Sequence, residues 1–193
     1  MSESETRAAQ HLRTSGRTEY LTPKWVLDAL GKFDLDPCAS VVRPWPTATK
    51  HYTIEDDGLV QPWSGFIFLN PPYGKADNGT SEIDWVRKLV AHDPGGIALL
   101  SAGKTETKLF QRFIFPECDG ILFLTPRIQF CNTDGSSTGG TFGPSCLVAF
   151  SEAALERLRS AVQRGLLGGY VVIVDSMEGH RPDDSYRKRG RLF

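Results

Sequence analysis

The stretch Phe66-Ile67-Phe68-Leu69-Asn70-Pro71-Pro72-Tyr73 joins an apolar run to a proline-rich turn. The apolar run predicts a buried strand, and Asn70 follows its last residue. In open α/β sheets, ligands bind at the carboxyl ends of the strands. Two successive prolines neither continue a sheet ladder nor begin a regular helical turn, because they lack N–H groups and restrict the preceding residue. We therefore expect an amide, a free carbonyl and an aromatic ring on one rigid turn at a ligand-binding edge.

This combination of groups suits methyl transfer to an amino nitrogen. The amino group of adenine is a poor nucleophile, because its lone pair is delocalised into the ring. The Asn70 side-chain oxygen and the Pro71 carbonyl can each accept one N–H, which frees the lone pair, and Tyr73 can stack on the base. Asn70-Pro71-Pro72-Tyr73 resembles the signature of methyltransferases that act on amino or amide nitrogen using S-adenosylmethionine. The alternative is a plain turn at the end of a strand.

Length and composition indicate one globular domain with polar ends. The chain has 193 residues, of which 40% are hydrophobic and 23% charged. We divide it into a flexible N-terminal segment (1–19), a methyltransferase domain (20–175) and a charged tail (176–193). No apolar stretch has transmembrane length, and residues 1–5 lack the apolar region of a signal peptide, so we expect a cytoplasmic protein without membrane contact.

The spacing of the cysteines and histidines and the net charge further restrict the functional classes to which the protein can belong. The four cysteines form no C-x-x-C pair and are expected to be free thiols, and the four histidines lack metal-ligand spacing, so no metal is predicted. The net charge of −1 is not typical of a strong nucleic-acid binder, although charge segregated on one face still permits DNA binding. The basic run Arg187-Lys188-Arg189 either adds weak phosphate affinity or is a solvated tail.

Two segments before the central strand are candidates for cofactor binding. Thr22 is a good N-cap and Pro23 suits the first turn of a helix that Gly31 ends. The start of this helix would offer N–H groups to the methionine carboxylate, but Thr22 can equally be only a helix cap. A short strand at residues 33–36 ends at Asp36, which can receive the methionine ammonium group.

The residues after Asp36 fit the same interpretation. Pro37 breaks the strand, and the small residues Cys38 and Ala39 let the backbone approach a ligand. Further on, Tyr52 and Ile54 predict a short strand, and no acid can be assigned to the cofactor ribose. Asp57 stands where the acid that accepts the adenine amino group of the cofactor is expected; we favour it over Asp56 because it precedes a glycine, and the alternative is an Asp-Gly turn.

Four residues are candidates for substrate contacts. Lys75 can meet a phosphate or be an exposed, solvated lysine. Lys104 and Thr105 follow the apolar run at 97–100, near a strand-to-helix turn. Arg127 either contacts DNA or pairs with an acid inside the fold.

The remaining pattern alternates strands with helices. Ser81 and Asp84 predict a capping box at the start of a helix. Apolar runs predict further strands at 97–100, 121–124, 146–150 and 169–174, with helices near 109–113 and after Ser151. The predicted fold is α/β: a Rossmann-like class I methyltransferase with a mostly parallel central sheet, helices on both faces and an antiparallel hairpin at one edge.

In order along the chain, the motifs are Tyr20-Leu21-Thr22-Pro23, Leu35-Asp36-Pro37-Cys38-Ala39, Asp57-Gly58-Leu59, Asn70-Pro71-Pro72-Tyr73-Gly74, Lys104-Thr105-Glu106-Thr107, Arg127-Ile128-Gln129-Phe130 and Phe142-Gly143. This series resembles the phage-type DNA N-6-adenine methyltransferases (the Dam family) and covers about residues 20–150. The order, with the cofactor motifs before Asn-Pro-Pro-Tyr, resembles the gamma-type arrangement.

The resemblance implies a specific activity and setting. It implies site-specific transfer of a methyl group from S-adenosylmethionine to N-6 of an adenine flipped out of double-stranded DNA. It also implies a monomeric enzyme, encoded by a phage or prophage and acting in the bacterial cytoplasm, with restriction-modification, anti-restriction and regulation all open as roles. No separate recognition domain is visible, so loops 74–80 and 132–145, the latter expected to be mobile, are candidates for reading the DNA sequence. The alternatives are methylation of RNA or of protein glutamine, and a non-catalytic DNA-binding protein on the same fold.

Overall fold

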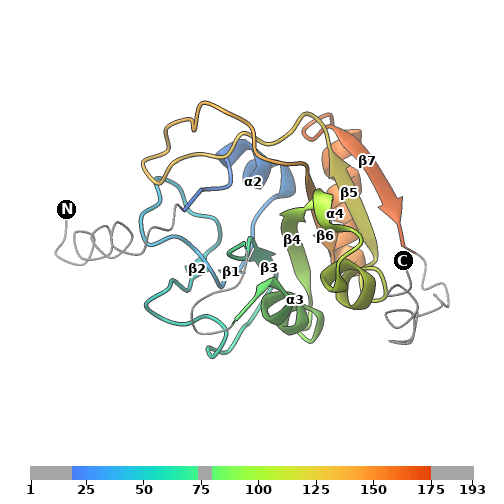
Figure 1. The fold of residues 1–193 in the computed structure, drawn as a ribbon, viewed down its shortest axis with the longest axis horizontal. Coiled ribbons are helices and arrows are strands. Elements are labelled where there is room, and N and C mark those ends of the chain that lie inside the picture. Colours follow the sequence, from blue (N-terminus) through green and yellow to red (C-terminus); the bar gives the residue numbers. More distant parts are fainter. Residues whose placement is uncertain (1–18, 74–79, 175–193) are drawn as a thin grey trace, which may run out of the picture.

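The computed structural model describes residues 19–73 and 80–174 (Figure 1). The predicted tail, Lys75 and all but the last residue of the predicted N-terminal segment lie outside the described residues. The strands are β1 (Leu35–Asp36), β2 (Lys50–His51), β3 (Ile67–Leu69), β4 (Gly96–Ser101), β5 (Gly120–Leu124), β6 (Ser145–Ala149) and β7 (Gly169–Ile173). The helices are α2 (Lys24–Leu30), α3 (Glu82–Val90) and α4 (Glu152–Gln163), with a 3-10 turn η1 (Ala102–Lys104) and a π-helix η2 (Phe110–Ile114). The fold is therefore α/β, as predicted.

The strands form one mixed sheet in the order β2-β1-β3-β4-β6-β5-β7. Neighbours from β2 to β4 are parallel, whereas β6 is antiparallel to β4 and β5, and β7 is antiparallel to β5. Five strands therefore run in one direction and two in the other. Antiparallel pairing is confined to the end of the sheet formed by β6, β5 and β7, where β5 and β6 are consecutive in sequence and β7 is the edge strand. All five residues of β6 are buried, as an interior strand requires, whereas β7 is largely exposed at the edge.

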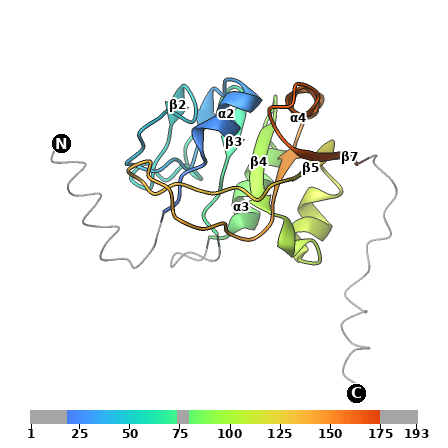
Figure 2. The same ribbon diagram turned by 90° about the horizontal axis from the view of Figure 1, so that it is seen from above.

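Two hydrophobic clusters make up the core. One contains side chains of α2 and α4 with Ile97 and Leu99 of β4, and the other contains side chains of α3 and η2 with Ala98 and Leu100 of the same strand. Because successive side chains of a strand point to opposite faces, the two clusters lie on opposite sides of the sheet. Figure 2 shows α2 and α4 on one side of β4 and α3 on the other. The core is thus divided by β4 into two clusters.

Local structure departs from expectation at two places. Thr22 is not the N-cap of α2: Pro23 occupies that position, and its side chain has no group that could accept a capping bond. The Thr22 hydroxyl accepts a hydrogen bond from Asn70 instead. The strand predicted at Tyr52 and Ile54 is also wrong: β2 ends at His51, and Ile54 is 59% exposed in the following turn. A helix does end at Gly31, which has a positive φ of 85° and donates its N–H to Leu27.

Other local predictions are confirmed. The capping box at the start of α3 is present, with the Ser81 N–H and hydroxyl 2.9 and 3.0 Å from Asp84 Oδ2. The helix expected near 109–113 is the short π-helix η2. Both elements pack under the sheet on the side of the second hydrophobic cluster.

The long connection from β5 to β6 contains neither helix nor regular strand and packs against the start of the described chain. Leu21 and Cys131 form an antiparallel bridge, and Cys131 forms a second bridge with Ser137. The Phe142 ring lies 4.5 Å from the Tyr20 ring, centroid to centroid. This loop therefore shares an edge of the molecule with the segment that leads into Thr22 and α2.

Three further observations concern only residues 19–73 and 80–174. None of the helices there combines the length and the apolar character needed to cross a bilayer. This part of the chain also holds no group of three or more His, Cys, Asp or Glu side chains able to bind a metal ion. The four cysteines are free thiols, and Cys118 and Cys146 are buried.

Candidate functional site

Three segments meet at the carboxyl ends of β1 and β3. The two strands are parallel neighbours, with Leu35 opposite Ile67, so the residues that follow them lie side by side. The Cys38 thiol donates to the Asn70 backbone carbonyl at 3.1 Å. The Asn70 amide nitrogen in turn donates to the Thr22 hydroxyl at 3.2 Å. The structure thus brings together the predicted cofactor residues and the predicted catalytic turn.

Of the two polar atoms in the Asn70 side chain, one is hydrogen-bonded to another described residue and the other is not. Its Nδ2 is bound to Thr22, whereas its Oδ1 is buried and has no hydrogen-bond partner among the described residues. Buried polar atoms almost always have a partner, so an unpaired oxygen requires an explanation. Asn70 Oδ1 is therefore an unused hydrogen-bond acceptor, to which an N–H group of a ligand could donate. Pro71 beside it is buried, Pro72 is exposed, and Tyr73 is 50% exposed.

Thr22 orients this amide. Its side chain is 2% exposed, and its backbone carbonyl accepts a hydrogen bond from Trp45 Nε1 at 3.1 Å. The hydroxyl is therefore fixed, and by holding Nδ2 of Asn70 it directs Oδ1 away from itself. Sequence reasoning identified Thr22 but not this contact, because 48 residues separate the two partners.

Asp36 is a buried carboxylate at the end of β1. It is 3% exposed, its Oδ1 accepts from the Cys38 N–H at 3.1 Å, and its Oδ2 accepts from the Thr47 hydroxyl at 2.5 Å. Burial raises the pKa of this carboxyl from its usual 3.8 to about 6, although the hydrogen bonds from Thr47 and Cys38 act in the opposite direction. A buried acid of this kind favours a cationic ligand, which would restore the interactions lost with water.

The Asp57-Gly58 turn packs directly on the turn that follows Asp36. A Cβ atom on Gly58 would lie 1.8 Å from the Pro37 carbonyl oxygen, so only glycine fits there. Asp57 has a φ of 52°, in the left-handed region, and is exposed. The neighbouring Asp56 uses its carboxylate to accept the Thr53 N–H at 2.8 Å. Asp57 Oδ1 accepts the Leu59 N–H at 3.3 Å, a contact typical of an Asp-Gly turn, so Asp57 as the ligand-facing acid stays a prediction.

Lys88 of α3 anchors this loop to the protein. Its ammonium group donates to the Leu59 and Gln61 carbonyls, each at 2.6 Å, and lies 5.0 Å from the centre of the Trp63 ring. The Trp63 indole N–H donates to the Gly58 carbonyl at 2.7 Å. Burial lowers the pKa of Lys88. The contacts of Lys88 and Trp63 therefore hold the loop that follows Asp57 against the rest of the protein.

On the opposite side of Asn70, Tyr73 lies beside a pair of charges. Lys104 Nζ is 2.8 Å from Glu82 Oε2 and 5.5 Å from the centre of the Tyr73 ring. Lys104 was predicted to contact substrate, and the structure pairs it with Glu82, a residue that sequence reasoning missed. An acid in the first turn of a helix needs no function, so the sequence carried no separate signal for Glu82. Thr105, next to Lys104, accepts a hydrogen bond from Gln111 through its backbone carbonyl.

Arg127 stands apart from this cluster. It is exposed in the loop after β5, and no hydrogen bond or ion pair of the described residues joins it to Asn70, Asp36 or Tyr73.

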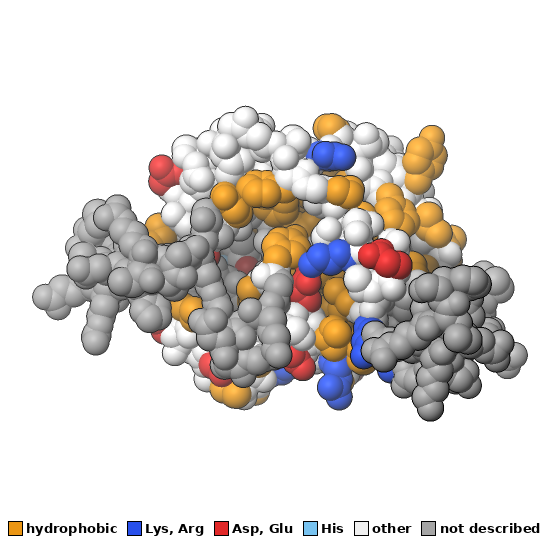
Figure 3. Space-filling view, in the orientation of Figure 1, with side chains coloured by type: hydrophobic (Ala, Val, Ile, Leu, Met, Phe, Trp, Pro, Cys, Tyr) orange, Lys and Arg blue, Asp and Glu red, His pale blue; other side chains and the backbone are white. Residues whose placement is uncertain are grey.

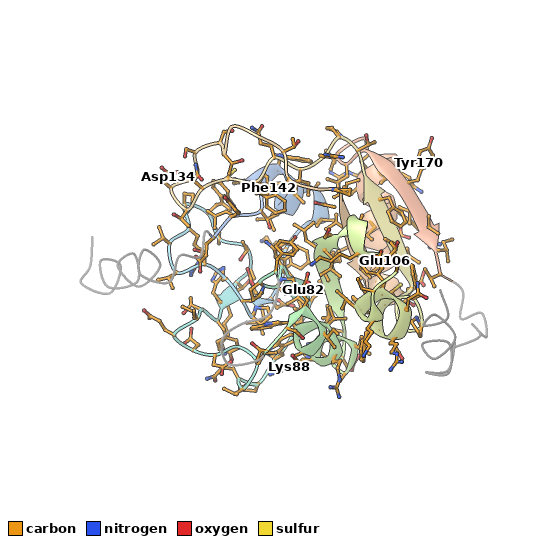
Figure 4. The ribbon with its side chains drawn as sticks, viewed as in Figure 1. Glu82, Lys88, Glu106, Asp134, Phe142 and Tyr170 are labelled. Carbon is orange, nitrogen blue, oxygen red and sulfur yellow. The ribbon has the colours of Figure 1, made fainter. Side chains whose placement is uncertain are left out.

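Figure 4 shows Phe142 and Glu82 on one face, Phe142 near α2 and Glu82 at the start of α3. Figure 3 shows that hydrophobic side chains, with a few acidic and basic ones, are exposed on this face.

Comparison with known proteins assigns a family. No curated protein and no solved structure matches the chain. The family model described as DNA N-6-adenine-methyltransferase (Dam) matches residues 9–166, a longer range than the motifs at about 20–150. This match confirms the resemblance drawn from the motifs and covers most of the 193 residues. The chain therefore belongs to the DNA N-6-adenine-methyltransferase (Dam) family.

Proposed function

We propose that the protein is an S-adenosylmethionine-dependent enzyme that methylates N-6 of adenine at specific sites in double-stranded DNA. The family supports methyl transfer to adenine in DNA. The site supports the chemistry, because it combines an open amide acceptor, an aromatic ring and a buried acid at one edge of the sheet. Five strands running in one direction also support a Rossmann-like arrangement, in which this edge binds ligands.

The unpaired Oδ1 of Asn70 is the observation that carries the proposal. An adenine amino group placed there would donate one N–H to Oδ1, and the Pro71 carbonyl is the second acceptor on the same turn. Both bonds draw the nitrogen towards a tetrahedral geometry, so its lone pair becomes available for attack. Tyr73, half exposed beside them, offers its ring to the base. Positioning of this kind can account for much of a rate enhancement.

The residues that would hold the cofactor lie beside Asn70. When bound, S-adenosylmethionine supplies a methyl group made electrophilic by its sulfonium. The buried Asp36 suits the methionine ammonium group, since burial removes its carboxylate from water and raises its pKa. Cys38 and Ala39 continue this turn, Thr22 and Pro23 lie at the start of α2, and Asp57 is the acid proposed for the cofactor adenine. Cys38 also ties this turn to Asn70 through its thiol.

The substrate must be flipped out of the duplex, because a stacked and paired adenine keeps its amino group out of reach. Lys75, Thr105 and Arg127 are proposed as substrate contacts, Lys75 and Arg127 from the sequence alone, and Lys104 is proposed to act on the substrate side of the site beside Tyr73. We further propose a monomeric, cytoplasmic enzyme of phage or prophage origin.

The test is a transfer assay with labelled S-adenosylmethionine. Unmethylated DNA, RNA and a glutamine-containing peptide would be incubated in parallel with the wild type and with Asn70→Ala. Gln163→Ala, which removes an exposed amide at the end of α4, serves as the control. We expect label in DNA with the wild type and the control, and almost none with Asn70→Ala.

Calorimetry separates chemistry from cofactor binding. Asn70→Ala should bind S-adenosylmethionine about as well as the wild type, because Asp36 and Asp57 are unchanged. Label in RNA or peptide instead of DNA would refute the substrate, and wild-type turnover by Asn70→Ala would refute the mechanism.

A further inference from the structure

We propose that Glu82 and Lys104 are positioning residues that hold the Tyr73 ring in the orientation on which the target base stacks. This inference rests on the proposed function and extends it to residues outside the Asn-Pro-Pro-Tyr turn. Lys104 Nζ lies 5.5 Å from the centre of the Tyr73 ring, within the range of a cation–π contact. It lies 2.8 Å from Glu82 Oε2, so the carboxylate fixes the ammonium group beside the ring.

The capping of α3 does not explain the burial of Glu82. It is the first residue of α3, but the capping box there uses Ser81 and Asp84 instead. Glu82 is 8% exposed, and its Oε1 is buried without a hydrogen-bond partner among the described residues. A buried carboxylate with one unpaired oxygen destabilises the fold. The presence of Glu82 at this position therefore points to a role in the site rather than in the stability of the helix. Among residues 19–73 and 80–174, the side chain that pairs with Glu82 is Lys104.

The geometry explains why Tyr73 needs such support. The ring follows two prolines, is half exposed and extends from the end of β3. Lys104 reaches it from η1, at the end of the neighbouring strand β4, and Glu82 reaches Lys104 from α3. In Figure 4, Glu82 lies between Phe142 and Lys88, in the middle of the face on which the strands end. Side chains from two further elements thus support the Tyr73 ring, which stays half exposed.

The experiment is a double-mutant cycle on DNA methylation. Lys104→Met keeps the aliphatic stem but removes the charge, and Glu82→Gln keeps the shape of the carboxylate but removes its charge. Each should lower kcat by about tenfold, the scale expected for one cation–π contact in a partly desolvated site, while affinity for S-adenosylmethionine is unchanged. In a Tyr73→Ala background the same changes should cost less than about twofold, because the ring through which they act is gone.

Three comparisons keep the test specific. Lys104→Arg should restore most of the rate, since a guanidinium also pairs with carboxylates and stacks on rings. Arg159→Met breaks another ion pair, with Glu152 in α4, and should leave the rate unchanged. A 2-aminopurine base at the target position should fluoresce less brightly with wild type than with Lys104→Met, because an ordered ring quenches a stacked base.

The outcomes are distinct. No methylation of DNA by the wild type would refute the proposed function and this role with it. Methylation by the wild type together with equal losses in the Tyr73 and Tyr73→Ala backgrounds would refute the positioning role alone. A loss confined to the Tyr73 background would establish it.

Discussion

Replacing Asp36 by Asn should make the protein without cofactor more stable at neutral pH. The carboxylate is 3% exposed, and Asn can keep its contacts: Oδ1 accepts from the Cys38 N–H, and Nδ2 donates to the Thr47 hydroxyl, which can accept as well as donate. The substitution therefore removes a buried charge with little change in packing. The same charge is the one proposed to bind the methionine ammonium group.

The size of the effect follows from the pKa of Asp36. Burial raises it from the usual 3.8 to about 6, a difference that corresponds to about 3 kcal/mol. Between these two values the folded state binds more protons than the unfolded state, so stability falls as pH rises from about 4 to above 6. At pH 7 the folded protein bears the full cost of the ionised carboxylate. Below pH 4 the acid is protonated in both states and the cost disappears.

Urea unfolding at a series of pH values between about 4 and 7 measures this directly. We expect Asp36→Asn to exceed the wild type by up to about 3 kcal/mol at pH 7 and the difference to shrink towards zero near pH 4. Asp28→Asn, which breaks an exposed ion pair with Lys24 in α2, should change stability by about 0.5 kcal/mol or less. Calorimetry should show that Asp36→Asn binds S-adenosylmethionine at least about tenfold more weakly. A variant that is less stable than the wild type at pH 7, or equally stable at all pH values, would refute the reasoning.

Two further substitutions test the geometry of the site. Thr22→Val removes the acceptor of the Asn70 amide nitrogen, and kcat at saturating cofactor should fall by about tenfold or more, since an unpaired buried donor costs about 1–3 kcal/mol; an unchanged kcat would show that the amide needs no such support. Gly58→Ala should destabilise the protein by about 3 kcal/mol or more in urea unfolding, because its Cβ would lie 1.8 Å from the Pro37 oxygen; a stability equal to the wild type would show that the two turns separate easily.

The sequence predicted the central part of the fold well, for a physical reason. Buried strands of an α/β sheet are short apolar runs bounded by turns, and those around 67–69, 97–100 and 121–124 are of this kind. The capping box at Ser81 was predictable because both partners are three residues apart. A local prediction that failed, Thr22 as the N-cap of α2, concerns a hydroxyl that contacts Asn70, 48 residues away.

Long-range pairing was not predictable in the same way. An apolar strand has the same sequence pattern inside a sheet as at its edge. The place of β6 between β4 and β5 could therefore not be inferred from the sequence. β2 was misplaced because its two residues, Lys50 and His51, are polar and are held there only by pairing with β1. The positions of β2 and β6 were not predicted because each strand pairs with strands that are distant in sequence.

The site shows the same division. Asn70, Asp36 and the Asp57 turn were identified from their types and order, and the structure brings their segments together. The Thr22–Asn70 and Glu82–Lys104 contacts were missed because each joins residues that are 48 or 22 positions apart. Glu82 in particular looks like an ordinary acid at the start of a helix. Candidate site residues can thus be proposed from their types and order, whereas the contacts that hold them require the fold.

The most direct test of the account is nucleoside analysis of methylated DNA. Unmethylated DNA would be treated with the protein and S-adenosylmethionine, digested to nucleosides and examined by mass spectrometry, with Asn70→Ala in parallel. The account predicts N6-methyladenine as the product of the wild type and its absence with the variant. Methylated cytosine, or no methylated nucleoside from a protein that binds the cofactor, would contradict it.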